Sequence, residues 1–199
     1  MILSLENVFK EYTQGREPVP VLKNINMTVE EGDYLAIMGP SGCGKSTLLS
    51  LIAGFLKPDS GKILCPTKRI SYAFQEPRLF PWLTVEENLK AVLPKDAPTL
   101  QIRDMLAFVG LSGTEKLYPD ELSGGMKSRI SLARALLYGG ELFLLDEPFS
   151  ALDQELSTAL AKKLREHLKN TGASAILITH RREDALILAD RIIENSLVF

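Results

Sequence analysis

The chain has 199 residues, of which 45% are hydrophobic and 24% charged, the balance of a globular protein that can bury a sizeable core. Its formal charge of −2 at pH 7 gives no broad basic surface, so nucleic acid is not the expected main partner. No run approaches the roughly 18 apolar residues of a membrane span, and the start lacks the pattern of a signal peptide. Two cysteines make no disulfide framework, so we expect reduced thiols in a cytosolic protein.

The N-terminal part is expected to be rich in β-strands. Ile2–Val8 alternates weakly between apolar and polar residues, and Val21–Val29 alternates at period two, the pattern of a half-buried strand. Glu31-Gly32-Asp33 then turns the chain into a third apolar strand, Tyr34–Met38. The sequence therefore predicts a β-rich opening ahead of an α/β core.

The stretch after the third strand matches the phosphate-binding pattern G-x-x-x-x-G-K-[ST] at every position, with Gly39, Pro40, Ser41, Gly42, Cys43, Gly44, Lys45 and Ser46. It lies between a strand and a helix-like run from Thr47, the context that this motif requires. The glycines let backbone N–H groups face phosphates, and the helix N-terminus adds its positive end. Lys45 would then reach the β- and γ-phosphates, and the Ser46 hydroxyl would bind Mg²⁺. The alternative is a glycine-rich turn that happens to precede a lysine.

The middle of the chain begins with a turn at Lys57–Gly61, followed by short strand candidates at Lys62–Leu64 and Ile70–Phe74. Gln75 comes directly after the second candidate. Ligand-binding residues gather at the carboxyl ends of strands in an open α/β sheet. Taken alone, however, Gln75 fits a solvated loop residue better.

The section from about residue 76 to residue 138 is expected to form a helical subdomain, inserted within a single domain that spans residues 1–199. Thr84 with Glu87 three residues later forms a capping-box pattern for a short helix, and Leu100–Val109 predicts a second helix. A long helix is expected to open at Leu122-Ser123-Gly124-Gly125. No buried-strand pattern interrupts this section between residues 76 and 122.

The last third returns to an α/β pattern. The apolar run Leu142–Leu145 ends in Asp146 and Glu147, and such a run is typical of a central parallel strand buried on both faces. The elements expected after it are a helix at Gln154–Lys169, a buried strand at Ala175–Thr179 that stops at His180, a helix at Arg182–Ala189 and two short closing strands.

Three further groups of residues could serve a phosphate loop, although each has an ordinary structural explanation. Asp146 could order Mg²⁺ and Glu147 could polarise the attacking water, but a strand-end Asp-Glu pair also fits a solvated turn. Ser123-Gly124-Gly125 at a helix start could bind a second anion, although a flexible helix cap explains it equally well. A lone histidine such as His180 is more often structural than catalytic.

The order of these pieces along the chain is more specific than any one of them. The pieces follow one another in this order: the phosphate loop, Gln75, Leu122-Ser123-Gly124-Gly125-Met126, Asp146-Glu147, Ser150-Ala151-Leu152-Asp153 and His180. This series closely resembles the nucleotide-binding subunit of ATP-binding cassette (ABC) transporters across nearly the whole chain. The resemblance implies an α/β P-loop NTPase core sheet with an N-terminal antiparallel β part and a small inserted helical subdomain.

The resemblance also implies a role for each matched position near the nucleotide. Tyr12 matches the aromatic residue that stacks on adenine, and Gly39–Thr47 match the loop that holds the phosphates and Mg²⁺. Gln75 matches the glutamine that touches Mg²⁺ and the attacking water. Asp146 matches the Mg²⁺-associated acid, and Glu147 matches the catalytic base.

The remaining matched positions include one more contact with the nucleotide and several contacts that imply a dimer. His180 matches the histidine that contacts the γ-phosphate, and Asp153 matches the acid of the loop that contacts the second subunit. Ser123, Gly124 and Gly125 match the signature that caps ATP bound on the other subunit. Two such chains, identical or pseudo-symmetric, would pair head to tail with two nucleotides between them.

By this resemblance, the chain is expected to be a cytosolic ATPase on the inner face of the cell membrane that powers solute import. Its partners would be separate permease subunits and an extracytoplasmic solute-binding protein. Met126 replaces the usual glutamine of the signature, as in importers resembling those for nitrate, sulfonates and taurine. The alternatives are a non-transport ABC ATPase acting on DNA or the ribosome and, less favoured, a P-loop kinase.

Phe80, Trp82 and Leu83 allow two interpretations. They could form a small core for the helical section, or one or more of them could line an exposed groove. A contiguous exposed apolar patch that contains an aromatic residue usually marks a partner site. In the resembled family the permease inserts a short helix beside this loop, so we expect Phe80 or Trp82 to be substantially exposed.

Overall fold

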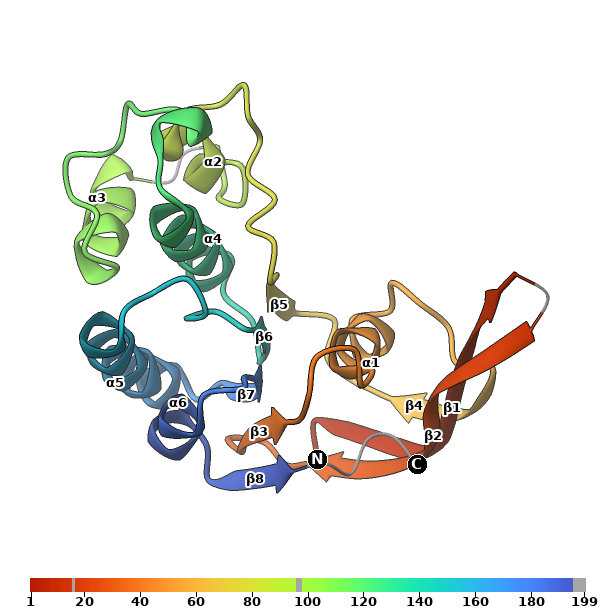
Figure 1. Ribbon diagram of the computed structural model, residues 1–199. Helices are drawn as coiled ribbons and strands as arrows, with labels where there is room; N and C mark the ends of the chain where they lie inside the picture. Colours follow the sequence, from red (N-terminus) through yellow and green to blue (C-terminus); the bar gives the residue numbers. More distant parts are fainter. Residues whose placement is uncertain (16, 96–97, 195–199) are drawn as a thin grey trace.

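The computed structural model describes residues 1–15, 17–95 and 98–194, and its centre is a parallel sheet (Figure 1). The strands of this sheet, in spatial order, are β5 (Ile70–Ala73), β6 (Leu142–Asp146), β7 (Ser174–Ile178), β3 (Tyr34–Met38) and β8 (Arg191–Glu194). All five residues of β6 and of β7 are buried, as expected for central strands covered on both faces. Leu142 and Leu144 enter one core while Phe143 and Leu145 enter the other, because successive side chains point to opposite faces.

A second, antiparallel sheet has the order β2-β1-β4 and consists of β1 (Leu3–Gln14), β2 (Glu17–Val29) and β4 (Ser60–Leu64). The strands predicted at Ile2–Val8 and Val21–Val29 are both present but were predicted too short. The two strands pair from Leu3 opposite Val29 to Gln14 opposite Glu17, with register shifts along the way. Backbone pairing therefore extends β1 through a polar stretch whose own pattern does not indicate a strand.

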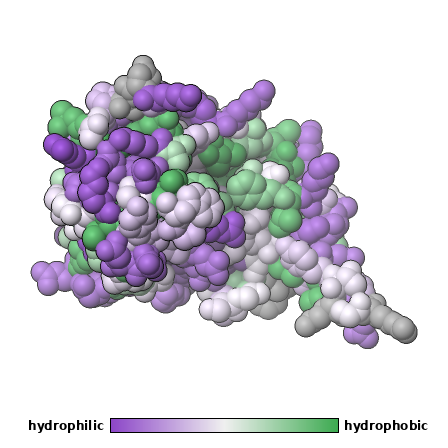
Figure 2. Space-filling view, turned by 90° about the horizontal axis from the view of Figure 1, so that it is seen from above, coloured by the Kyte–Doolittle hydropathy of each residue, from purple (hydrophilic) through white to green (hydrophobic). Residues whose placement is uncertain are grey.

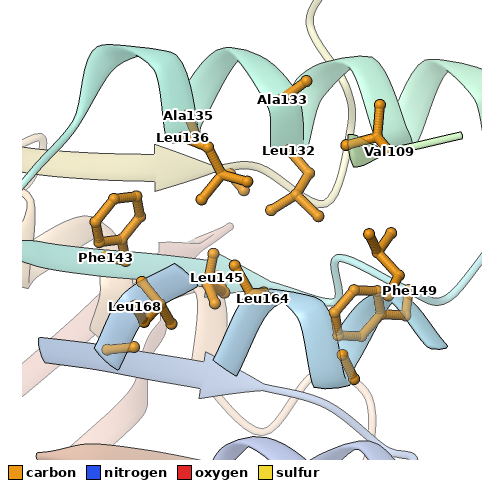
Figure 3. Close-up of a cluster of buried hydrophobic side chains, with 14 of the residues drawn as sticks. Val109, Leu132, Ala133, Ala135, Leu136, Phe143, Leu145, Phe149, Leu164 and Leu168 are labelled. Carbon is orange, nitrogen blue, oxygen red and sulfur yellow. The ribbon is translucent and has the colours of Figure 1, made fainter. Parts of the chain in front are cut away.

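Helices cover both faces of the parallel sheet. Helix α1 (Lys45–Ile52) shares one core with the antiparallel sheet, and its Leu48 and Leu49 are fully buried there. Helices α4 (Gly124–Tyr138), α5 (Gln154–Thr171) and α6 (Arg182–Leu188) lie on the opposite face. Figure 3 shows Leu132 and Leu136 of α4 meeting Phe143 and Leu145 of β6 in that second core.

Helices α2 (Val85–Lys90) and α3 (Thr99–Phe108), with the 3₁₀ turn η1 (Pro119–Glu121), lie with the start of α4 at the end of the molecule farthest from the β1–β2 hairpin (Figure 1). The predicted capping box is confirmed, since the Thr84 side chain accepts from Glu87 N and the Glu87 carboxylate accepts from Thr84 N. The Ser71 hydroxyl donates to Ala135 O at 2.5 Å and joins the far half of α4 to β5. The boundaries of the helical subdomain, about residues 76–138, remain a prediction.

At the C-terminal end, β8 pairs in parallel with β3, which confirms one of the two predicted closing strands. The other would fall within residues 195–199, outside the described residues. Within the described part of the chain, no helix is long and apolar enough to cross a membrane.

Candidate nucleotide-binding site

Strands β3, β5, β6 and β7 are parallel, so the loops that follow them meet at one edge of the sheet. A cleft of about 290 Å³ opens there. Its lining residues are Tyr12, Val21, Ser41, Gly42, Gly44, Lys45, Ser46, Thr47, Gln75, Asp146, Glu147 and Ile178. The fold thus brings together predicted site residues that are far apart in the sequence.

The phosphate-loop pattern ends where α1 begins. Gly44 has a φ of +91°, and a Cβ atom there would lie 2.9 Å from the Val21 carbonyl oxygen, so only glycine fits. As the N-cap of α1, Gly44 offers no side-chain acceptor to the first turn of the helix. The amides at the start of α1 and the positive end of the helix dipole therefore face the cleft, an arrangement suited to binding phosphate.

Lys45 is buried, with 8% of its surface exposed. Its ammonium donates to the carbonyl oxygens of Gly39 at 2.7 Å and Pro40 at 2.8 Å, and it lies 3.8 Å from Cys43 Sγ. These contacts hold a positive charge at the mouth of the loop. Ser46, next in the chain, is exposed at the same cleft.

Asp146 ends β6 and is 3% exposed. Its Oδ1 atom has no hydrogen-bond partner, while Oδ2 accepts a long hydrogen bond of 3.5 Å from the Tyr72 hydroxyl. Burial raises the pKa of the Asp146 carboxyl, the Ser46 side chain opposes the shift, and the charge of Glu147 adds to it. A buried carboxylate oxygen without a partner, beside a serine hydroxyl, is the hard-oxygen environment that Mg²⁺ prefers.

Glu147 has a φ of +49°, which is rare for a residue with a side chain, and its N–H donates to Ile178 O at 2.9 Å. One oxygen of its carboxylate, Oε2, lies 2.9 Å from Nδ1 of His180, which follows β7. The carboxylate is largely buried, with 11% exposed, whereas the His180 ring is 61% exposed. The predicted base is thus one of four non-glycine residues with a positive φ in the described part of the chain, and such backbone strain is common at functional sites.

Tyr12 and Gln75 also line the cleft. Tyr12 lies on β1 and is 42% exposed, and Gln75 follows β5 in an exposed loop. An exposed aromatic ring at the rim can stack on a flat base, and an exposed amide can turn toward bound phosphate.

Four predicted site residues lie away from this cleft. Ser123 and Gly124 are exposed at the start of α4, where the Ser123 hydroxyl accepts from Met126 N at 3.3 Å. A Cβ atom on Gly125 would lie 2.9 Å from Ala151 O, so the start of α4 packs closely against the loop after β6. Asp153 ends that loop as the N-cap of α5, where it accepts from Leu156 N at 2.9 Å.

Three residues of the site were not predicted from the sequence, namely Tyr72, Val21 and Ile178. Tyr72 alternates with buried residues along β5, so the period of the strand could have indicated that it faces α1. No motif marks its hydroxyl as a neighbour of Asp146, because that contact joins two strands far apart in the sequence.

Comparison with known proteins agrees with this geometry. Residues 22–150 match the protein family described as ABC transporter. The chain belongs to the ABC transporter family. The aliphatic sulfonates import ATP-binding protein SsuB of Bacillus cereus is 42% identical to this ABC chain, over 98% of this chain and 82% of the relative. The bicarbonate transport ATP-binding protein CmpD of a Synechocystis species is 39% identical, over 96% of this chain and 73% of that protein.

Solved structures give the same result for the ABC fold. A dimeric structure of MJ0796, a bacterial ABC transporter cassette, superposes with a TM-score of 0.90 at 29% identity, covering 96% of this chain and 93% of that one. A second structure of that cassette, in a post-hydrolysis state with ADP and Pi, gives a TM-score of 0.89. The predicted fold class is confirmed, and the chain is an ATP-binding ABC ATPase subunit.

Proposed function

We propose that this chain binds Mg²⁺-ATP in the cleft and hydrolyses it to drive an ABC importer. The observation that supports this proposal most strongly is the meeting of Lys45, Asp146 and Glu147 in one cleft beside the amino end of α1. These are a fixed cation, a buried carboxylate and a second carboxylate, the three kinds of group that phosphoryl transfer to water requires.

In this proposal, the loop from Gly39 to Thr47 wraps the phosphates and Lys45 neutralises their β- and γ-oxygens. Tyr12 stacks on adenine at the rim. Asp146, Ser46 and Gln75 would hold Mg²⁺, which neutralises phosphate charge when it is bound. The described residues hold no cluster of three His, Cys, Asp or Glu side chains, and Mg²⁺ in nucleotide sites commonly relies on one or two carboxylates and the phosphates themselves.

Glu147 is the proposed general base. Its carboxylate lies at the cleft, where it can accept a proton from water that attacks the γ-phosphate. His180, whose Nδ1 lies 2.9 Å from this carboxylate, orients it, and the proposal also gives His180 a contact with the γ-phosphate. The strained backbone at Glu147 directs the side chain into the cleft at a fixed position.

The proposed active unit is a head-to-tail dimer. Ser123, Gly124 and Asp153 are exposed away from the cleft of their own chain, so they are available to a nucleotide bound on a second chain. The dimeric form of the similar cassette supports this arrangement.

A groove of about 510 Å³ is the proposed docking site for a permease helix. It is lined by Phe55, Tyr72, Phe74, Phe80, Arg134 and Tyr138, among others. Phe80 is 41% exposed and its neighbour Trp82 is 70% exposed, which confirms the predicted exposure of this loop. Figure 2 shows hydrophobic residues gathered toward the middle of the upper face, with hydrophilic residues on either side.

The names of the relatives support a role in solute import, and an ATPase that drives a permease would act at the inner face of the membrane. They are described as import or transport ATP-binding proteins for aliphatic sulfonates and bicarbonate, which favours transport over action on DNA or the ribosome. We propose that the permease and an extracytoplasmic binding protein select the solute.

Phosphate release by the purified chain tests this proposal. We expect release from ATP that requires Mg²⁺ and stops when Mg²⁺ is chelated, together with co-purification of a membrane permease from cells. Hydrolysis that depends on added nucleic acid, with no permease recovered, would support the alternative function instead.

A further inference from the structure

Arg181 follows His180 directly, and its guanidinium reaches across to the loop formed by residues 147–153. Its Nη1 atom donates to Phe149 O and to Leu152 O, both at 3.1 Å. Its Nη2 atom donates to the side chain of Gln154, the first residue of α5. One planar side chain therefore holds two backbone carbonyls and the start of a helix together, which the rigid fork of arginine allows.

The loop that Arg181 contacts carries the proposed catalytic base and the proposed dimer-contacting acid. Glu147 begins it and Asp153 ends it. Between them, Phe149 is 1% exposed and its ring points into the core between α4 and α5 (Figure 3). Ala151 O packs against Gly125 at the start of α4. A shift of this loop would thus move the base, the dimer-facing acid and the contact with α4 together.

A buried carboxylate also contacts the guanidinium. Asp184 of α6 is fully buried, its Oδ1 accepts from the Ser157 hydroxyl of α5 at 2.6 Å, and its Oδ2 lies 3.4 Å from Arg181 Nε. That last contact is an ion pair without hydrogen-bond geometry, since Oδ2 has no hydrogen-bond partner. The arginine side chain is only 15% exposed, so its charge is partly desolvated and its bonds to the carbonyls gain strength.

We propose that Arg181 is a positioning residue for ATP hydrolysis, because it holds the loop 147–153 against the segment that follows β7. It thereby fixes the positions of Glu147 and Asp153 relative to each other. This inference rests on the proposed function, in which Glu147 is the base. His180 contacts Glu147 at one end of the loop and Arg181 contacts Leu152 near the other. Two consecutive residues after β7 therefore control both ends of the loop after β6.

Arg182 provides a matched control. It is the next residue in the chain and also an arginine, but it is exposed and its side chain pairs with Glu194, away from the loop. Replacing either arginine with glutamine removes the same charge, and only one of the two replacements releases the loop.

The test compares Arg181→Gln with Arg182→Gln in steady-state ATP hydrolysis, ATP binding and thermal melting. We expect Arg181→Gln to lower kcat by about 10- to 100-fold with unchanged ATP affinity, since a small misplacement of a catalytic group costs that much. We also expect it to reduce the ATP-held dimer when combined with Glu147→Gln. Arg182→Gln should match the unmodified chain in all three measurements. Equal kcat values for the two variants would overturn the inference.

A second variant covers the case in which Arg181→Gln does not fold. Arg181→Lys keeps a positive charge beside Asp184, but a single ammonium cannot bond Phe149 O, Leu152 O and Gln154 at once. A reduced kcat with an unchanged KM for this variant would support the positioning role, whereas an unchanged kcat would overturn it. Absence of ATP hydrolysis by the unmodified chain would contradict the proposed function, and the inference with it.

Discussion

Within the described part of the chain, Lys45 is the only buried lysine. A buried cation is costly unless polar groups compensate it, and the compensation here comes from two carbonyls of the lysine's own loop. These carbonyls hold the ammonium where phosphate oxygens are expected. The local backbone therefore places the positive charge, and Asp146, in the same cleft, interacts with it electrostatically.

Replacing Lys45 should separate nucleotide binding from folding. We expect Lys45→Ala to weaken ATP binding severely, because the charge that neutralises the β- and γ-phosphates is lost, while the protein stays folded. An ATP titration of the folded variant measures this effect, with Lys57→Ala, an exposed lysine beyond α1, as the control. Undiminished ATP affinity in Lys45→Ala would show that this loop is not the phosphate site.

At the residue scale, the site residues that lie within one motif were predicted from the sequence. The site residues that only the fold brings together were not. The phosphate loop was predictable because its glycines, lysine and serine are consecutive, and the backbone geometry they require is local. Tyr72 and Arg181 were not predicted as site residues, because their partners, Asp146 and Leu152, lie on other elements. Only the pairing of β5, β6 and β7 brings these groups together.

At the scale of elements, Asn88 of α2 determines the shape of the loop before that helix. It is fully buried, and its side-chain amide donates to the carbonyls of Phe80, Leu83 and Thr84 at 3.0–3.1 Å. Its Oδ1 atom accepts from Phe80 N at 2.8 Å. One side chain thus satisfies four backbone groups and holds Phe80 and Trp82 at the surface.

Asn88→Ala should destabilise the protein by about 2–3 kcal/mol, because Phe80 N loses its acceptor and Leu83 O loses its donor in a partly buried loop. The carbonyls of Phe80 and Thr84 keep their backbone donors. The chain has a single tryptophan, Trp82, which lies within this loop. Urea unfolding followed by its fluorescence therefore reports both the free energy of unfolding and the environment of the loop. Asn170→Ala, at an exposed position of α5, is the control and should change little. An equal effect of the two substitutions would refute this role for Asn88.

Trp82→Glu tests the proposed permease site, because the Trp82 ring lies 5.6 Å, between centroids, from the ring of Phe80, which lines the groove. We expect the variant to fold and bind ATP normally, but to lose association with the permease or to hydrolyse ATP without transport. Leu100→Glu, at a 64% exposed apolar position on α3, serves as the control for adding a surface charge. Normal transport by Trp82→Glu would rule out docking through this residue.

Element boundaries show which forces act beyond the local pattern. The capping box at Thr84 and Glu87 was predicted correctly, because all of its contacts lie within four residues. The strand after Val8 was missed, since it depends on pairing with β2 and β4 and on the irregular backbone at Asn7, whose φ is +51°. Local chemistry thus determined the helix start, and tertiary pairing determined the strand end.

At the scale of the whole molecule, the start of α4 and the nucleotide cleft are separate surfaces of one chain. Ser123 is exposed and does not line the cleft. In a head-to-tail pair, the same residue would face the nucleotide of the second chain. The family resemblance allowed this prediction, whereas no pattern within a single chain indicates that a helix start acts on another copy.

Ser123→Arg should prevent the dimer without abolishing ATP binding by the monomer. A long cation at the start of α4 would obstruct the second chain's nucleotide and repel the positive end of the helix dipole. Size-exclusion chromatography with ATP measures the dimer, and a nucleotide titration measures binding. Loss of ATP binding by the folded variant would show that Ser123 acts within its own chain.

The central claim, hydrolysis by Glu147 within an ATP-held dimer, is tested most directly by sizing the Glu147→Gln variant with and without ATP. The amide keeps the shape of the side chain but cannot accept the proton of the attacking water. We predict that this variant binds ATP, hydrolyses it far more slowly than the unmodified chain, and accumulates as a dimer only when ATP is present. Normal hydrolysis by Glu147→Gln, or a monomer at saturating ATP, would contradict the account.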